Sequence, residues 1–169
     1  MLDPDQLMRK AEDSRFYLWL LNLALNRMVP FNRPHGFKVQ EISKRHVRTS
    51  IPFRRSNLNH IKGLHATALA TLSEFTTGLL LLNIFGAKKY RIILQRLDIE
   101  YHYQGKTGAL ANFRVDDPWL DRCVNEPLKV QESVVVPCKI HIDDIRGNRL
   151  TTATIYWQLK PWEKVKTAV

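Results

Sequence analysis

The order of hydrophobic and polar positions predicts one helix, two paired strands, a long apolar helix and then a run of strands. Residues 5–28 repeat apolar side chains at helical spacing up to Pro30, which cannot continue a helix. Residues 37–42 and 46–51 alternate apolar and polar positions, as half-buried strands do, and a short polar turn separates them. Residues 52–64 contain Pro, Ser, Asn and Gly, which favours irregular structure.

The next segment is the one long apolar helix, which we predict over residues 65–85 with Gly86 at its end. Because it is apolar on nearly every side, it must be covered on nearly every side. A short helical insertion is expected over residues 116–127. Strand-like segments follow the long helix at 90–103, 109–115, 128–142 and 150–159. Strands joined by short turns pair antiparallel, so we expect an α+β fold in which a curved antiparallel sheet wraps around the long central helix.

The length of 169 residues suits one compact domain, and the hydrophobic content of 44% is enough for a core. The sequence has no internal repeat and no linker that would separate two domains. We expect an N-terminal helical extension over residues 1–34, the main domain over 35–162 and a C-terminal tail over 163–169.

Cysteine usage and the first residues of the chain indicate a cytoplasmic protein. Cys123 and Cys138 form neither a CxxC motif nor a disulfide framework, which suits a reducing compartment. The start of the chain is acidic, whereas the start of a signal peptide is basic. The apolar helix is long enough to span a bilayer, but its Thr, Ser and Glu residues argue against contact with lipid. We therefore expect no membrane span.

The net charge of +10, with a pI near 9.9, fits three kinds of partner: nucleic acid, an anionic membrane or a phosphate-bearing small molecule. The basic residues are scattered through predicted strands and turns and form no tract and no aromatic–basic signature. We therefore expect no nucleic acid. Two alternatives remain, a solvated basic surface and the recognition of phosphate near residues 59–74.

Glu74 departs most from its surroundings, because it is a carboxylate within the apolar helix. Burying a charged side chain without a partner is costly, which favours a chemical role. The polar turn at residues 59–65 leads directly into the start of this helix, where free N–H groups form an anion site. The alternative is a structural carboxylate that is satisfied by the hydroxyl of Thr71, Ser73 or Thr77.

Residues 59–74, with the sequence NHIKGLHATALATLSE, resemble the core motif of the PaaI-like acyl-CoA thioesterases of the hotdog fold and, more closely, of the related DUF4442 proteins. The family motif has an Asn, then a His-Gly-Gly or His-Ala-Gly step, then an apolar helix with an acidic residue. Asn59, His65 and Glu74 fall at matching positions. The resemblance covers residues 35–160 and implies the hotdog fold. It departs at Thr67, which stands where the family usually has a second glycine.

The resemblance implies hydrolysis of an acyl-CoA thioester. Glu74 would be the general base or the nucleophile, and Asn59 and His65 would assist it. The backbone N–H groups of Ala66 and Thr67 would bind the developing oxyanion. Further substrate contacts would come from Gly63, Leu64, Thr77, Lys88, Lys89 and Arg91, the last three against the phosphates of coenzyme A. No cofactor is implied beyond the coenzyme A of the substrate.

Each assignment has a structural alternative. His65 could bond only locally at the helix start, and Asn59 could only cap the turn. Thr67 could close the oxyanion site, which would leave a non-catalytic protein that binds acyl-CoA or an acyl lipid. His141 and Asp143 share one face of a predicted strand, but no third ligand is evident, so we expect no metal site.

Helical geometry indicates that a complete site needs two chains. The steps from His65 to Glu74 turn roughly half a circle at about 100° per residue, so the two side chains lie on opposite sides of one helix. One subunit cannot aim both at the same thioester, whereas two antiparallel helices in a homodimer can. The resemblance implies the same, because hotdog enzymes usually have their site at such an interface. We expect an acyl-CoA-type ligand and a homodimer, or a tetramer built from dimers.

Overall fold

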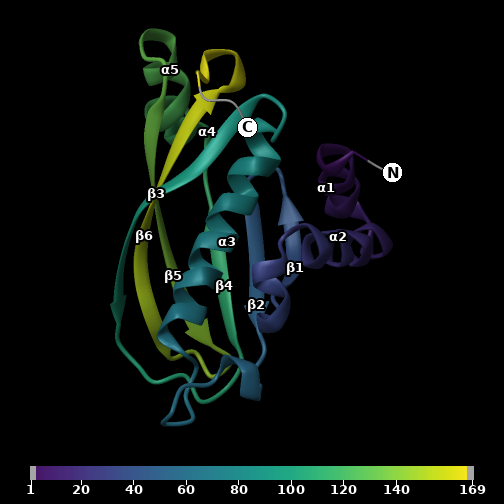
Figure 1. Cartoon of the computed structure of the whole chain (residues 1–169), viewed down its shortest axis with the longest axis vertical. Coiled ribbons are helices and arrows are strands. Elements are labelled where there is room, and N and C mark those ends of the chain that lie inside the picture. The colour runs from purple at the N-terminus through teal and green to yellow at the C-terminus, as the bar shows by residue number, and fades with distance from the viewer. Residues whose placement is uncertain (1–2, 167–169) are drawn as a thin grey trace.

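The computed structural model describes residues 3–166, and its strands form one antiparallel sheet that curves around the helix α3 (Figure 1). The order of the strands in the sheet is β1-β2-β4-β5-β6-β3. The strands are β1 (Lys38–Ser43), β2 (His46–Ile51), β3 (Tyr90–Tyr101), β4 (Ala109–Arg114), β5 (Val134–Asp144) and β6 (Arg149–Pro161). The helices are α1 (Pro4–Asp13), α2 (Arg15–Met28), α3 (Ala66–Phe85), α4 (Asp117–Leu120) and α5 (Glu126–Val130), with a π-helical turn (Asp121–Asn125) between the last two. The predicted α+β arrangement is confirmed.

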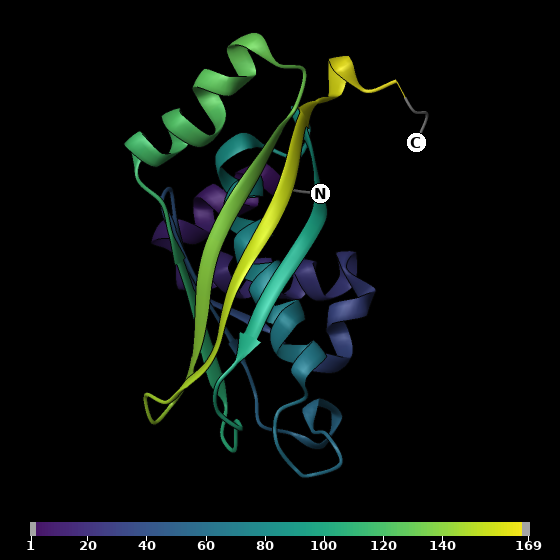
Figure 2. The same ribbon diagram turned by 90° about the vertical axis from the view of Figure 1, so that its left-hand side faces the viewer.

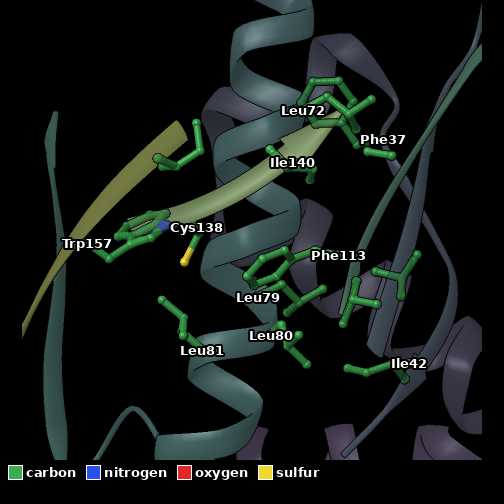
Figure 3. Packing of buried hydrophobic residues seen from close by; sticks show 14 of the residues in the cluster. Phe37, Ile42, Leu72, Leu79, Leu80, Leu81, Phe113, Cys138, Ile140 and Trp157 are labelled. Carbon is green, nitrogen blue, oxygen red and sulfur yellow. The ribbon is translucent and has the colours of Figure 1, made fainter. Parts of the chain in front are cut away.

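The central helix α3 is buried because its side chains are apolar around most of its circumference. Leu72, Leu80 and Leu81 are fully buried in the core (Figure 3). His65 caps the start of the helix, and Gly86 ends it with a φ of 78°. Within residues 3–166, α3 is the one helix with the length and hydropathy of a membrane span, but 56% of its apolar window is buried inside the protein, as in a core helix.

The N-terminal segment forms two helices, so the prediction of a single helix over residues 5–28 is wrong. Ser14 has extended backbone angles, with φ −137° and ψ 120°, and its hydroxyl accepts a hydrogen bond from the N–H of Tyr17 at 3.5 Å. Ser14 therefore caps α2 and interrupts the helical path. Both helices reach the main hydrophobic core, through Leu7, Met8 and Ala11 of α1 and Leu21 of α2.

The structure covers most of the predicted division of the chain. Residues 1–2 of the N-terminal extension and residues 167–169 of the C-terminal tail lie outside the described residues. Because α1 and α2 contribute to the same core as the sheet, the described part of the extension packs as one body with the main domain.

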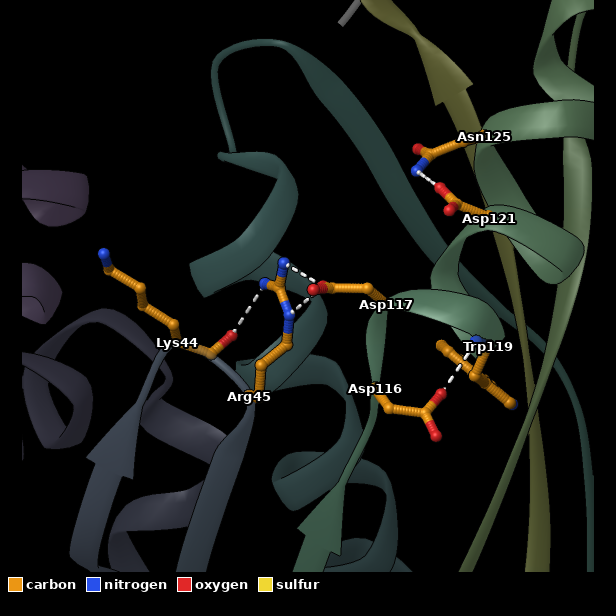
Figure 4. Close-up of polar contacts among 7 residues, drawn as sticks. All are labelled: Lys44, Arg45, Asp116, Asp117, Trp119, Asp121 and Asn125. Atoms are coloured by element: carbon orange, nitrogen blue, oxygen red, sulfur yellow. Dashed lines mark hydrogen bonds and ion pairs between the residues drawn. The ribbon is translucent and has the colours of Figure 1, made fainter.

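The helical insertion between β4 and β5 is longer than predicted. Helix α5 includes residues 128–130, which we expected at the start of a strand, and β5 begins only at Val134. Pro127 lies in the first turn of α5, where its missing N–H is not needed, and this position favours helix over strand. Arg45, in the turn between β1 and β2, contacts the insertion through an ion pair with Asp117 at 2.6 Å (Figure 4).

The two edges of the sheet differ in how they are covered. At the β1 edge, the side-chain amide of Asn22 in α2 donates to the carbonyl of Val39 at 3.0 Å and accepts from its N–H at 2.8 Å. Helix α2 therefore takes the place of a neighbouring strand there. At the other edge, β3 has β6 on one side and no strand on its other side among residues 3–166 (Figure 2). This edge exposes Ile93 and Leu94 and is open to pairing with another strand.

Candidate functional site

The turn before α3 is organised by the side chain of Asn59. Its Oδ1 accepts hydrogen bonds from the backbone N–H groups of Ile61 at 3.1 Å and Gly63 at 3.0 Å. These bonds support Lys62 at a φ of 55°, a left-handed conformation that is uncommon for a non-glycine residue. Because both acceptor positions of Oδ1 are used, the Nδ2 amide is the part of Asn59 that can bind a ligand.

The start of α3 offers fewer free N–H groups than the sequence predicts. His65 Nδ1 accepts from the backbone N–H of Thr67 at 3.2 Å and lies 2.8 Å from the Thr67 hydroxyl. His65 is thus the N-cap of the helix, and the N–H of Thr67, which we predicted as an oxyanion donor, is occupied. The N–H of Ala66, the other predicted donor, has no acceptor within residues 3–166, as is usual in the first turn of a helix.

A groove of about 300 Å³ opens beside this end of the helix, and we call it the helix-start groove. Its walls come from the turn before α3, from the first turn of α3 and from the end of β3 with the loop that follows. They are Asn59, Leu64, Ala66, Leu69, Tyr101, His102, Tyr103, Gln104 and Gly105. The structure therefore brings together three predicted site residues, Asn59, Leu64 and Ala66, but His65 and Thr67 are not among the walls.

The contribution of β3 to this groove is missed by the sequence analysis. The Tyr101 hydroxyl donates to the carbonyl of Ala66 at 2.9 Å, and partial burial raises the pKa of that hydroxyl. His102 Nε2 lies 2.9 Å from the hydroxyl of Thr152. The one signal in the sequence is the Tyr-His-Tyr run at the end of a predicted strand, because aromatic and imidazole side chains at a strand end are available to a ligand.

Asn57 is a second residue that the sequence analysis misses. Its side chain is almost fully buried, and its amide donates to the carbonyls of His35 and Pro52, both at 2.9 Å. Its own carbonyl accepts from the N–H of His65 at 2.8 Å. Asn57 thus fixes the helix start against the N-terminal segment. Nothing in the sequence separates this buried amide from that of Asn59.

Glu74 lies about two turns further along α3, roughly 12 Å from Ala66 along the helix axis, and is not a wall of the helix-start groove. Its carboxylate is half-buried, and burial raises its pKa. Within residues 3–166, no hydrogen-bond donor or cation pairs with this carboxylate. A partly desolvated carboxylate without a partner is typical of a functional site.

The hydroxyls beside Glu74 on its own helix do not satisfy it. Thr71, Ser73 and Thr77 each donate to a backbone carbonyl of α3, at 2.9, 3.2 and 3.0 Å. Because a hydroxyl has one hydrogen to donate, none remains for the carboxylate. The alternative in which these hydroxyls donate hydrogen bonds to the Glu74 carboxylate is therefore wrong for a single chain.

Two predicted substrate contacts, Thr77 and Gly63, have structural roles. Thr77 is fully buried, and its hydroxyl accepts a hydrogen bond from Trp157 Nε1 at 2.9 Å within the core. Gly63 is buried beside Gln104, and a Cβ at Gly63 would lie 2.7 Å from that side chain. Neither residue is a wall of the helix-start groove.

The predicted phosphate contacts lie at the opposite end of α3. The helix has 20 residues and hence a length of about 30 Å, which separates Lys88, Lys89 and Arg91 from the helix-start groove of the same chain. Lys88 pairs with Asp3 at 3.1 Å, and Arg91 donates to Gln158 Oε1 at 3.0 Å. One chain alone does not bring these cations to the groove.

Metal-ligating side chains do not gather in the described part of the chain. No group of three or more His, Cys, Asp or Glu residues that could hold a metal ion occurs within residues 3–166. His141 and Asp143 share one face of β5, as their spacing predicts, with His141 Nε2 3.6 Å from Asp143 Oδ2, but Asp143 also pairs with Arg149.

A sheet curved around one long helix, with a groove at the helix start and a carboxylate further along, defines a hotdog-fold protein. The family model of DUF4442, a domain of unknown function, matches residues 18–159. The chain therefore belongs to the DUF4442 family. No curated protein sequence matches it.

Several solved structures share this fold. A protein of unknown function from Pseudomonas aeruginosa, described as a probable thioesterase, is 21% identical with a TM-score of 0.76, over 85% of this chain and 95% of that chain. A thioesterase from Haemophilus influenzae is 10% identical with a TM-score of 0.68, over 89% and 95%. A mutant thioesterase from Staphylococcus aureus is 14% identical with a TM-score of 0.64, over 79% and 100%. These likenesses confirm the hotdog fold.

Proposed function

We propose that this protein is a cytoplasmic thioesterase that hydrolyses an acyl-CoA thioester, with Glu74 as general base or nucleophile. The observation that carries the proposal is the half-buried Glu74 carboxylate, which has no partner within residues 3–166. Burial that raises a carboxylate pKa moves it towards the range in which a general base works best. The thioesterases among the structures of the same fold support this class of reaction.

The helix-start groove supplies the other groups that hydrolysis needs. Asn59 and Ala66 line this groove, so the Nδ2 amide of the one and the N–H of the other are the donors that we assign to a substrate there. The N–H of Ala66, with the positive end of the helix dipole behind it, stabilises the oxyanion that forms when the thioester carbonyl is attacked. Where Glu74 is the base, it takes a proton from the attacking water, the C–S bond breaks, the coenzyme A thiolate leaves and takes up a proton, and the acid keeps the water oxygen. Where Glu74 is the nucleophile, the thiolate leaves a mixed anhydride, which water then hydrolyses to the acid and free Glu74.

The proposed site lies between two copies of the chain. Ala66 and Glu74 are about two helical turns apart on one helix, and the open edge of β3 offers a surface on which a second copy can pair. If the two central helices run antiparallel, Glu74 of one chain approaches the groove of the other. The same arrangement brings Lys88, Lys89 and Arg91 of one chain towards coenzyme A phosphates at the groove of the other.

Sedimentation should show a dimer, and Ile93→Lys at the β3 edge should yield a monomer without activity.

Glu74→Gln tests the catalytic assignment. We expect hydrolysis across a panel of acyl-CoAs, followed by thiol release, to fall by about 10²–10⁴-fold, the usual cost of losing a general base. Glu126→Gln removes an exposed carboxylate in α5 that, in the described part of the chain, pairs only with Lys129, so it is the matched control and should retain the parent rate. Full activity in Glu74→Gln would show that the carboxylate takes no part in the reaction.

The raised pKa of Glu74 gives two pH effects with known sign. Activity should fall as pH decreases through this pKa, because a base must be ionised, and the fall should begin at higher pH than for an ordinary Glu. The free energy of unfolding should increase as pH decreases through the same pKa, because the folded state binds this proton more tightly than the unfolded chain does. Glu74→Gln should therefore be as stable as the parent or more stable at neutral pH.

A second candidate function is non-catalytic binding of acyl-CoA or an acyl lipid. The observation that favours it is the Thr67 N–H, which is occupied by His65 Nδ1 and leaves the oxyanion site one donor short. Calorimetry separates the two functions. The protein would be a binding protein and not an enzyme if it bound acyl-CoA at micromolar concentration without releasing thiol, and if Glu74→Gln bound it equally well.

A further inference from the structure

The outer face of α2 and of the turn after it is an exposed apolar surface. Phe16, Trp19 and Leu23 follow each other at steps of three and four, so they lie along one side of the helix. Their exposed fractions are 62%, 58% and 56%, and Met28 at the end of the helix and Phe31 in the turn after it are 61% and 69% exposed. We call these five residues the α2 outer face. Large apolar side chains gathered in this way usually mark an interaction site.

The opposite side of α2 is fixed to the protein, so the helix cannot rotate to bury its outer face. Leu21 is 3% exposed in the core. Asn22 is bonded through its side-chain amide to both backbone groups of Val39 in β1. In Figure 1, α2 lies on the outside of the molecule beyond β1. The α2 outer face is thus fixed in orientation and remains exposed to solvent within residues 3–166.

The segment that carries this surface contains charged residues of one sign. Residues 14–40 contain no Asp and no Glu, and their charged residues are Arg15, Arg27, Arg33 and Lys38. The acidic residues nearest in sequence are Asp13 and Glu41, and with Glu12 they line a cavity beside Arg15 and Leu18 at the start of α2. Arg15 and Arg27 lie at the two ends of α2, are exposed and form no ion pair within residues 3–166. Arg27 and Arg33, at the end of α2 and in the turn after it, therefore place exposed cations beside this aromatic and aliphatic surface.

We propose that the α2 outer face binds peripherally to a lipid bilayer that carries anionic headgroups. Phe, Trp and Leu on one side of a helix insert at the boundary between headgroups and acyl chains, and nearby Arg and Lys side chains contact lipid phosphates. The net charge of +10 favours the same partner. The proposal is independent of the thioesterase reaction, since the α2 outer face shares no residue with the helix-start groove.

Flotation of the full chain with lipid vesicles tests this proposal. We expect binding to vesicles of phosphatidylcholine mixed with phosphatidylglycerol and weaker binding to phosphatidylcholine alone. Added salt should weaken only the binding to the anionic vesicles, because it screens their charge. The double variant Phe16→Ser, Trp19→Ser should reduce partitioning by on the order of 100-fold, because two large apolar side chains no longer insert. Arg15→Glu with Arg27→Glu should remove the preference for the anionic vesicles.

The matched control replaces two exposed apolar residues far from α2 in sequence. Val130 and Ile145 are 85% and 67% exposed, and Val130→Ser with Ile145→Ser should bind vesicles like the parent. Circular dichroism checks that each variant is folded. Absence of binding to anionic vesicles would overturn the proposal, as would an equal loss in the control. A change of sedimentation in Phe16→Ser, Trp19→Ser without vesicle binding by the parent would assign the surface to a second copy of the chain.

Discussion

The hydrogen bond between Thr77 and Trp157 decides whether Thr77 serves the fold or the substrate. Thr77 is fully buried in α3, and its hydroxyl accepts from Trp157 Nε1 at 2.9 Å. Trp157, in β6, is 6% exposed, so no water can take over this role easily. Thr77→Val keeps the shape and the branched Cβ and removes the hydroxyl, which is the acceptor for Trp157 and a donor to the carbonyl of Ser73. The indole N–H then remains buried without a partner.

The expected loss of stability follows from this geometry. A buried donor left unsatisfied costs about 1–3 kcal/mol, the added methyl group returns part of it, and helix propensity changes little between Thr and Val. For a chain of this length, about 2 kcal/mol corresponds to a fall in Tm of roughly 4–8 °C. Gly78 leaves no room for relaxation, because a Cβ there would already lie 2.7 Å from the Trp157 ring.

Thermal and urea denaturation, with acyl-CoA affinity measured in parallel, test the reasoning. Thr71→Val is the matched control, since its hydroxyl bonds only to the carbonyl of Thr67 in the same helix at 2.9 Å, and its loss leaves no buried donor. We expect Thr77→Val to lose stability and keep its affinity for ligand. Stability equal to that of Thr71→Val would refute the role of the hydrogen bond, and a selective loss of affinity would return Thr77 to the substrate site.

Two further predictions concern the last hairpin and the helix start. Asp144→Ala should cost about 1–3 kcal/mol, because the carboxylate accepts from the N–H groups of Arg146 and Asn148, both at 2.9 Å. Burial alone would raise the pKa of Asp144, but these hydrogen bonds together have the larger effect, so the pKa is lowered. In urea denaturation, the difference in unfolding free energy between Asp144→Ala and the parent should therefore shrink as pH falls through the lowered pKa. Thr67→Gly should hydrolyse short acyl-CoAs faster, because it removes the β-branched side chain from the start of α3 together with its hydroxyl contact to His65. An unchanged kcat would exclude crowding of the oxyanion site by Thr67.

The parts of the fold that follow from hydrophobic periodicity are predictable from the sequence. Residues 46–51 alternate because one face of β2 is buried, whereas the alternation in β1 is interrupted by a bulge between Val39 and Glu41. Residues 66–85 are apolar on most sides because the sheet surrounds α3. The break at Ser14 is not predictable in this way, since the apolar repeat continues across it and the cap is a single hydroxyl. Residues 128–130 are apolar in either state, and Pro127 decides for helix.

The candidate site is predictable only where residue type alone carries information. Glu74 is evident because a carboxylate contrasts with an apolar helix. The groove walls Tyr101 and His102 come from β3, and their approach to the helix start depends on the pairing of β3 with β6, which no local pattern encodes. The distinct roles of Asn57 and Asn59 are likewise set by tertiary neighbours, because one amide meets carbonyls of another segment and the other meets its own turn.

The polar residues of α3 show why its one carboxylate stands apart. Ser73, Thr76 and Thr77 are fully buried, and each hydroxyl donates a hydrogen bond to a backbone carbonyl of the same helix. The Thr76 hydroxyl also hydrogen-bonds with that of Thr49, and the Thr77 hydroxyl accepts from Trp157 Nε1. A hydroxyl can satisfy itself in this way, so it is compatible with a helix enclosed by a sheet. An ionised carboxylate has only acceptors and cannot bond to helix carbonyls. Glu74 therefore needs donors from outside residues 3–166, and water, a substrate or a second copy can supply them.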